Sequence, residues 1–274
     1  MKKHESLSSE TFRTHQEMRG VYEDLEKLPD RGHPYCITLS KPDRYFGFIG
    51  TSHTVDTNHS QWTRLKDEWQ RFIESTNPNK IVFYEGRSSM PTADTDEEAI
   101  SRGADSGYTR WLANRAGIES VCPEPDMSQE IQELVGLGFG EDELTTYYVG
   151  RQVAQWRRYD YRTDPDLNDY MARTVRRYMS ARKWSKEFTV DEVRGLIEAY
   201  LDGNTIELAP RDLFSRIADP SENPVSSASS MVRNRSIFTE LERQWASGKD
   251  VFCVYGSGHA IVLEPALRKL LEEN

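Results

Sequence analysis

The stretch Phe48-Ile-Gly-Thr-Ser-His53 indicates how this chain folds, because an apolar run that begins at Tyr45 ends there in Gly-x-x-His. The stretch Tyr255-Gly-Ser-Gly-His259 ends another apolar run in the same way, near the other end of the chain. Short apolar runs of this kind are typical of strands buried in a sheet. The carboxyl ends of parallel strands share one edge of the sheet, where α/β proteins bind ligands. We therefore expect the two histidines to meet at that edge.

The segments between these two stretches alternate between strand-like and helix-like periodicity. This order is typical of parallel strands joined by right-handed helical crossovers. A Lys-Pro-Asp turn between the first two apolar runs favours a hairpin at the start. The expected strands cover 35–39, 45–49, 81–84, 118–122 and 251–255. The expected helices cover 59–73, 97–116 and 230–246, and a closing helix has Pro265 in its first turn. The sequence predicts an α/β protein with a mixed, mostly parallel sheet flanked by helices.

The chain divides by pattern into a sheet-forming core and an all-helical insertion, within one domain overall. Residues 1–30 form an N-terminal arm or a docked helix, 31–126 and 226–274 form the α/β core, and 127–225 form the insertion, which is lid-like. Between residues 147 and 186, ten Lys or Arg and four Asp give a net charge of +6, with aromatic residues interleaved. These are solvated helical faces over an aromatic core, or a basic lid that recruits an anionic substrate.

Composition limits the classes of protein to consider. The chain has 274 residues, of which 36% are hydrophobic, enough for a substantial core. A net charge of −10 makes nucleic acid and anionic membranes unlikely partners. Three widely spaced cysteines favour free thiols over disulfides or a zinc knuckle. No stretch approaches eighteen apolar residues and no secretory signal is recognisable, so we expect a cytoplasmic protein without a membrane span.

Carboxylates follow two further strands of the expected sheet. Glu85 comes directly after the apolar run 81–84, and Glu124 and Asp126 follow the run 118–122. Glu85 is a candidate for catalysis or metal binding, the alternative being a carboxylate that interacts with a helix dipole or a turn. Glu124 and Asp126 are candidates for substrate binding, together with Arg87; Asp126 is alternatively the N-cap of the following helix.

Two glycines and a polar pair complete the expected site. Gly50 and Gly256 are expected to turn the chain sharply off its strands, so that each histidine points back over the edge. Arg233 and Asn234 lie on or beside the apolar face of the helix near 230–246, where they either cap backbone groups or face the site.

The remaining histidines lack a partner pattern. We expect them at the surface, except that His59, with Asp56 and Asn58, could line the cleft. The surface set is His4, His15 and His33.

With these motifs the chain resembles the TraB/Tiki superfamily, and more distantly the erythromycin esterase and ChaN-like haem-binding families. The shared order is Gly-x-x-His, a strand ending in Glu, an Arg-Asn helix and a second Gly-x-x-His. The resemblance implies that His53, Glu85 and His259 bind a metal or act as acid and base, and that Arg233 and Asn234 shape the pocket. The chain departs from the pattern at Val232, where relatives have a carboxylate, and we expect no membrane anchor of the Tiki kind.

Three functions compete at this stage. The first is a hydrolase of peptide or ester bonds, in which His53, Glu85 and His259 activate water, with or without a divalent metal such as Zn, Mn or Co. In this hypothesis Arg233 steadies an oxyanion, and the partner is a small-molecule or peptide substrate, anionic if the lid recruits it. The second is a protein that binds haem or another small molecule without turnover. The third is a regulatory or interaction protein with a vestigial cleft.

Overall fold

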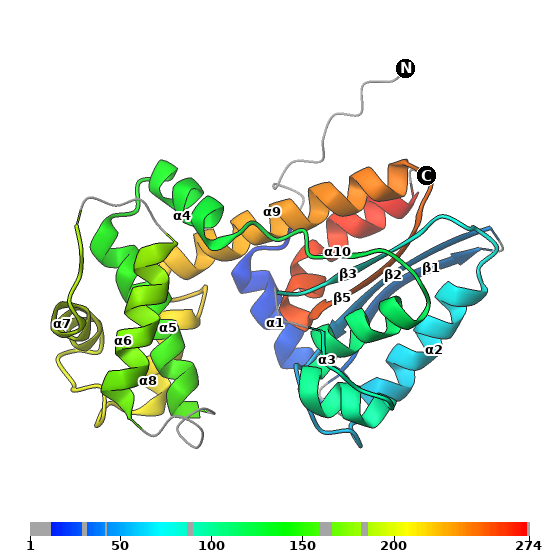
Figure 1. Cartoon of the computed structure of the whole chain (residues 1–274). Coiled ribbons are helices and arrows are strands. Elements are labelled where there is room, and N and C mark those ends of the chain that lie inside the picture. Colours follow the sequence, from blue (N-terminus) through cyan, green and yellow to red (C-terminus); the bar gives the residue numbers. More distant parts are fainter. Residues whose placement is uncertain are drawn as a thin grey trace. The chain divides into compact units, whose positions relative to one another are not determined.

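The structure, a computed structural model, describes residues 12–28, 32–41, 43–86, 90–158, 166–181 and 186–272 (Figure 1). The chain forms two compact units. One contains residues 1–124 and 234–274, and the other contains residues 125–233. The first boundary follows Glu124, and the second falls between Arg233 and Asn234, inside a continuous helix. We call them the α/β unit and the helical unit.

The α/β unit contains the sheet and the helices that cover it. Its elements are α1 (His15–Leu25), β1 (Tyr35–Lys41), β2 (Arg44–Thr51), α2 (Gln61–Glu74), β3 (Lys80–Tyr84), α3 (Asp96–Arg115), β4 (Ser120–Val121), the C-terminal part of α9 (Pro224–Ala246), β5 (Asp250–Gly256) and α10 (Ser257–Glu272).

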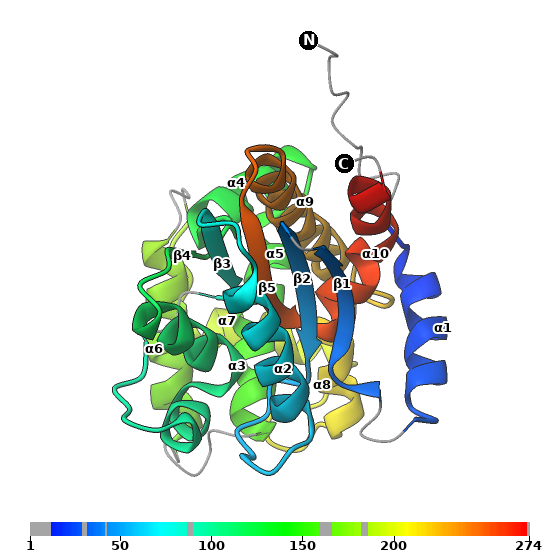
Figure 2. The same ribbon diagram turned by 90° about the vertical axis from the view of Figure 1, so that its right-hand side faces the viewer.

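The sheet has the strand order β1-β2-β5-β3-β4, which Figure 2 shows side by side. The hairpin strands β1 and β2 are antiparallel, whereas β2, β5, β3 and β4 are parallel to one another. The expected mixed, mostly parallel sheet is thus confirmed. The last strand in sequence lies in the middle of the sheet, so its end lies between the ends of β2 and β3.

Two layers of helices bury the two faces of the sheet. On one face, Ile49, Val82 and Phe252 pack in one core with side chains of α2 and α3. Side chains alternate between the faces of a strand, so the neighbouring Gly50 faces the other layer. There its α-carbon lies so close to α10 that an added Cβ would lie 2.9 Å from the Cβ of Ala260.

We expected Gly50 and Gly256 to turn the chain sharply off their strands, and this expectation was wrong. Neither Gly50 nor Gly256 has a positive φ, and both lie within their strands rather than in a turn beyond them. Both lie where a neighbouring group leaves no room for a methyl group. A Gly-x-x-His pattern here reports close packing instead of a sharp turn.

Within the N-terminal segment, the described residues 12–28 contain the helix α1, which is docked. The Thr14 side chain caps α1, and Phe12 packs edge-on against Phe238 of α9. The backbone N–H of Arg13 donates to the carbonyl of Val262, and its guanidinium forms an ion pair of 2.6 Å with Glu264. These contacts hold the start of α1 against α10.

The closing helix begins earlier than expected. It starts at Ser257, so Pro265 lies in its interior and not in its first turn. His259 is consequently the third residue of a helix rather than part of a loop.

Glu264 is a buried carboxylate that accepts hydrogen bonds from three side chains. Tyr35 donates to it at 2.5 Å, and Arg13 and Arg268 donate at 2.6 Å each. Burial alone would raise the pKa of Glu264, but the hydrogen bonds from Tyr35, Arg268 and Arg13 outweigh it and leave the pKa below its ordinary value. A group with a lowered pKa stabilises the fold above its ordinary pKa and loses that effect as the pH falls through the lowered value.

We therefore expect Glu264→Gln to lower the free energy of unfolding by about 3 kcal/mol near neutral pH. The difference from the unchanged protein should shrink as the pH falls below the ordinary pKa of 4.5, because the carboxyl is then protonated first in the unfolded chain and, below the lowered pKa, in the folded protein as well. Urea unfolding at neutral and acidic pH measures this. The control is Asp24→Asn, which removes a largely exposed pair with Lys27 and should cost under about 0.5 kcal/mol. Equal stability of Glu264→Gln at neutral pH would contradict the prediction.

The helical unit is made of α4 (Met127–Gly136), α5 (Glu141–Arg158), α6 (Leu167–Ser180), α7 (Val190–Tyr200), α8 (Arg211–Ala218) and the start of α9. Helix α6 shows how it packs. Met171, Val175 and Tyr178 are buried, whereas Arg173, Arg176 and Arg177 are exposed. This arrangement fits solvated basic faces over a core that includes aromatic residues.

Helix α9 starts six residues before the expected position. Asn223 accepts the backbone N–H of Val225 at 2.9 Å, and Pro224 occupies the first helical position. Asparagine at the N-cap followed by proline is a favoured helix start, which explains why the helix begins here.

The three cysteines are free, as expected. Burial raises the pKa of Cys36 to about 11, so this thiol stays protonated at neutral pH. Among the described helices, none combines the length and the apolar character that a membrane span requires.

Candidate functional site

Residues at the ends of β2, β3 and β5 line a cleft of about 760 Å³ in the α/β unit. Four of the six histidines of the chain line it: His33, His53, His59 and His259. Glu85 and five hydroxyl-bearing side chains form much of the remaining wall. The two Gly-x-x-His stretches and the strand that precedes Glu85 therefore meet in one place, as the parallel sheet predicted.

His53 is held in place by a buried aspartate. It follows β2 with a φ of 51°, a backbone conformation that is costly for a residue with a side chain. Its Nδ1 lies 2.9 Å from Oδ2 of Asp105, and the Thr51 hydroxyl donates to the same oxygen. A carboxylate oxygen accepts, so Nδ1 of His53 carries the hydrogen and Nε2 carries the lone pair when the ring is neutral.

Asp105 reaches this position because α3 is broken beside it. Ala104 has φ 48° and ψ −151°, so two helical segments meet there at a kink. Gly103 and Gly107 both lie against Pro91, which would meet an added Cβ at 3.0 and 3.1 Å. The kink turns the buried side chain of Asp105 towards His53.

Glu85 connects the two histidines. Its Oε2 accepts the backbone N–H of Gly256 at 2.6 Å and lies 3.3 Å from Nε2 of His53. Its Oε1 lies 3.7 Å from Nε2 of His259. A lone pair on Nε2 facing a carboxylate oxygen is repulsive unless a proton or a cation lies between them. The cluster is therefore suited to hold a proton or a metal ion.

His259 lies in the first turn of α10, and a hydrogen bond and an aromatic contact hold its ring in place. Its Nδ1 lies 2.6 Å from Oδ1 of Asn234, and its ring packs edge-on against Tyr255. Asn234 is completely buried. Since the amide oxygen accepts from Nδ1, the Nε2 of His259 carries the lone pair in the neutral ring and also faces Glu85.

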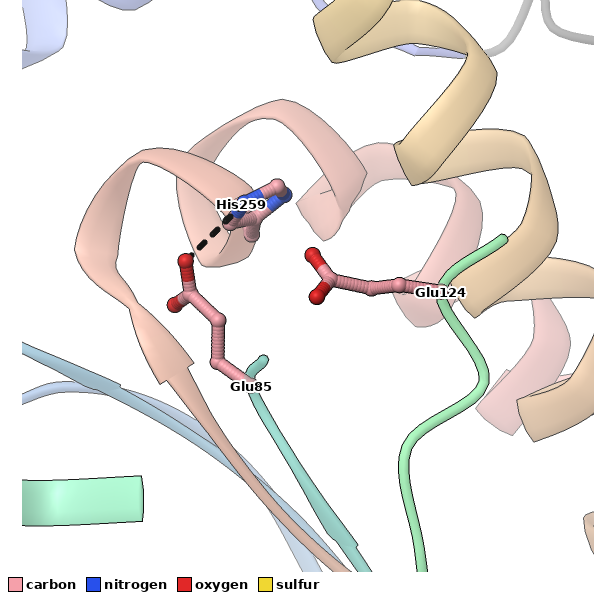
Figure 3. Close-up of side chains that lie close together, drawn as sticks. All are labelled: Glu85, Glu124 and His259. Carbon is pink, nitrogen blue, oxygen red and sulfur yellow. Dashed lines mark ion pairs between the residues drawn. The ribbon is translucent and has the colours of Figure 1, made fainter. Parts of the chain in front are cut away.

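Glu124 joins the cluster from the loop after β4. Its Oε2 accepts the backbone N–H of Gly86 at 2.9 Å, and Ser236 of α9 holds the loop by donating to the carbonyl of Pro123. Figure 3 shows Glu85, Glu124 and His259 close together. Each offers one ligand atom, and these atoms lie within 4.8 Å of one another, so the three side chains could hold a metal ion.

This group differs from the set that the sequence suggested for a metal. Carboxylate oxygens and imidazole nitrogens are the ligands that Zn²⁺ and Mn²⁺ accept, so the chemistry of the donors fits. Glu124 stands where we expected His53. His53 is instead hydrogen-bonded to Asp105, which is typical of a histidine that accepts a proton at Nε2.

The structure describes two of the three other residues that we predicted for the site, Asp126 and Arg233. Asp126 caps α4, where its side chain accepts the backbone N–H of Gln129, so the capping alternative is confirmed. Arg233 belongs to the helical unit, although its neighbour Asn234 belongs to the α/β unit. Arg87 lies outside the described residues.

Sequence reasoning missed three residues of the site. They are Asp105, Tyr22 of α1, and His33, which we expected at the surface. The signal for Asp105 was a pair of glycines, Gly103 and Gly107, in the middle of an otherwise helical pattern. Tyr22 and His33 had no local signal.

Comparison of the chain with models of protein families, with curated proteins and with solved structures found no match. The chemistry of the site must therefore be inferred from its geometry.

Proposed function

We propose that this protein is a hydrolase that activates water in the cleft formed at the ends of β2, β3 and β5. One observation supports this most directly. Both His53 and His259 have Nδ1 bound to a side-chain oxygen and Nε2 directed at Glu85. Imidazoles oriented in this way are typical of general bases and of metal ligands.

In this proposal, different residues bind the metal, accept the proton and orient the histidines. Glu85, Glu124 and His259 would hold a divalent metal, which when bound lowers the pKa of water towards neutrality. His53 accepts the proton of the attacking water at Nε2. Asp105 stabilises the charged ring that results, and Asn234 keeps His259 in the tautomer that presents Nε2.

The substrate is a small molecule or a peptide with an ester or amide bond. A cleft of about 760 Å³ is large enough for a small molecule or a short peptide segment. The residues that line it are mostly polar, which fits a polar substrate better than the apolar face of haem. A Soret band on titration with haem would instead support the haem-binding alternative.

Metal content and turnover test the proposal together. We expect the protein to bind Zn, Mn or Co, and Glu124→Gln to weaken the affinity at least about 100-fold. The matched control is Glu119→Gln, which changes an exposed glutamate near the other end of β4. The measurements are elemental analysis, metal titration, and rates on panels of esters, peptides and phosphoesters.

The outcomes separate the possibilities. Turnover that is lost on chelation and restored by metal supports the metal-dependent reaction. Turnover that survives chelation assigns the reaction to His53, Asp105 and Glu85 without metal. If the protein binds no metal and turns over no member of the panels, the hydrolase proposal is wrong.

A further inference from the structure

Two histidines of the cleft lie outside the Glu85 cluster. His33 lies two residues before the hairpin strand Tyr35–Lys41, and His59 lies two residues before the helix Gln61–Glu74. Six histidines occur in 274 residues, yet four of them are among the twelve residues that line this cleft. His53 and His259 account for two, which leaves His33 and His59 to be explained.

His59 presents a hydrogen-bond donor. Its Nδ1 accepts the backbone N–H of Gln61 at 3.1 Å. A ring nitrogen that accepts carries no hydrogen, so the hydrogen of the ring is on Nε2. In this state Nε2 of His59 can only donate to a bound group.

Tyr22 and Ser257 add a second donor. The two hydroxyl oxygens lie 3.1 Å apart and share one hydrogen bond. The pair has two hydroxyl hydrogens and uses one between them, so the other is left for a ligand. Burial raises the pKa of Tyr22, and the charge of Glu85 acts in the same direction, so the phenol keeps its hydrogen.

These donors belong to residues that line one cleft, and no Lys or Arg is among the described residues that line it. Oxyanions satisfy several donors at once, since each oxygen accepts more than one hydrogen bond. The negative charge of Glu85 is partly offset by the backbone N–H of Gly256, which donates to this carboxylate.

We propose that the cleft binds an oxyanion group of the substrate, a phosphate or a carboxylate, through Nε2 of His59 and the hydroxyl pair of Tyr22 and Ser257. His33 lines the same space and supplies a further imidazole. This inference deepens the proposed function by defining the substrate as an ester or amide that carries an acidic group. The binding step itself does not depend on turnover.

The test is titration of the metal-depleted protein with inorganic phosphate, followed by calorimetry or NMR. Two variants remove the donors. His59→Asn keeps a side-chain acceptor for Gln61 but lacks Nε2, and Tyr22→Phe removes the phenol. The control is Tyr170→Phe, which removes a hydroxyl that donates to a backbone carbonyl in the helical unit. Circular dichroism checks that each variant folds.

We expect phosphate to bind, with affinity about 5- to 10-fold weaker in His59→Asn and in Tyr22→Phe, and unchanged in Tyr170→Phe. Acetate in place of phosphate shows whether a carboxylate suffices, and binding of either ion supports the site. If neither ion binds, or if the two variants bind like the control, the inference is wrong.

A turnover experiment relates the site to catalysis. On substrates from the panels, the two variants should raise KM for acidic members by the same 5- to 10-fold and leave KM for neutral members unchanged. Equal effects on acidic and neutral members would overturn substrate recognition. Phosphate binding without hydrolysis of any substrate would contradict the hydrolase function and leave the oxyanion site standing.

Discussion

Replacing Asp105 by asparagine is expected to reduce hydrolytic turnover by about 10³- to 10⁴-fold while the chain still folds. The carboxylate accepts from both Thr51 and His53. Both hydrogen bonds go to the same oxygen, Oδ2. An asparagine lacks the negative charge that stabilises the protonated ring, and it can place its NH₂ group instead of its oxygen at this position. Facing His53, the NH₂ group would donate to Nδ1 and move the hydrogen of the ring to Nε2, where a proton must be accepted.

Two measurements check this prediction. Initial rates give the loss of turnover, and ¹⁵N NMR of the histidine rings reports which nitrogen of His53 carries the hydrogen. The control is Asp250→Asn, a buried aspartate at the start of β5 and thus at the opposite edge of the sheet. The control should lose stability without changing the tautomer of His53. Turnover within about tenfold of the unchanged protein and an unaltered tautomer would show that Asp105 does not position His53.

Gly256→Ala is expected to displace His53 and to reduce turnover at least about 100-fold. An added Cβ would lie 2.5 Å from Nε2 of His53 and 3.3 Å from Oε2 of Glu85. The backbone of Gly256 has no positive φ, so the methyl group itself, and not the conformation, causes the conflict. Because His53 is half-exposed, it can move away, and the loss of stability should be only about 1–3 kcal/mol.

The matched control is Gly195→Ala in α7, where an added Cβ has no neighbour within 4 Å. A helical glycine of this kind should gain up to about 1 kcal/mol of stability on becoming alanine, with no change in turnover. Thermal unfolding, initial rates and the ring signals of His53 measure the contrast. Normal turnover in Gly256→Ala with unchanged His53 signals would mean that the neighbouring groups relax around the methyl group.

Local patterns in the chain were sufficient to predict the sheet and the residues at the ends of its strands. Apolar runs such as 45–49 and 251–255 predicted strands because burial on both faces demands continuous apolar sequence. Glu85 and the two Gly-x-x-His histidines were found because the ends of parallel strands share an edge. Asn234 was found because a polar residue beside an apolar helical face needs a partner.

The partners of these residues could not be obtained in that way, since they come from distant parts of the chain. Asp105 lies 52 residues from His53 and is aimed at it by a kink in α3, and Tyr22 lies 235 residues from Ser257. The reason for glycine at 50 and 256 is likewise the close packing of elements from opposite ends of the chain. Periodicity records which side of an element is buried, whereas the identity of the group on the other side of the contact depends on how the elements pack.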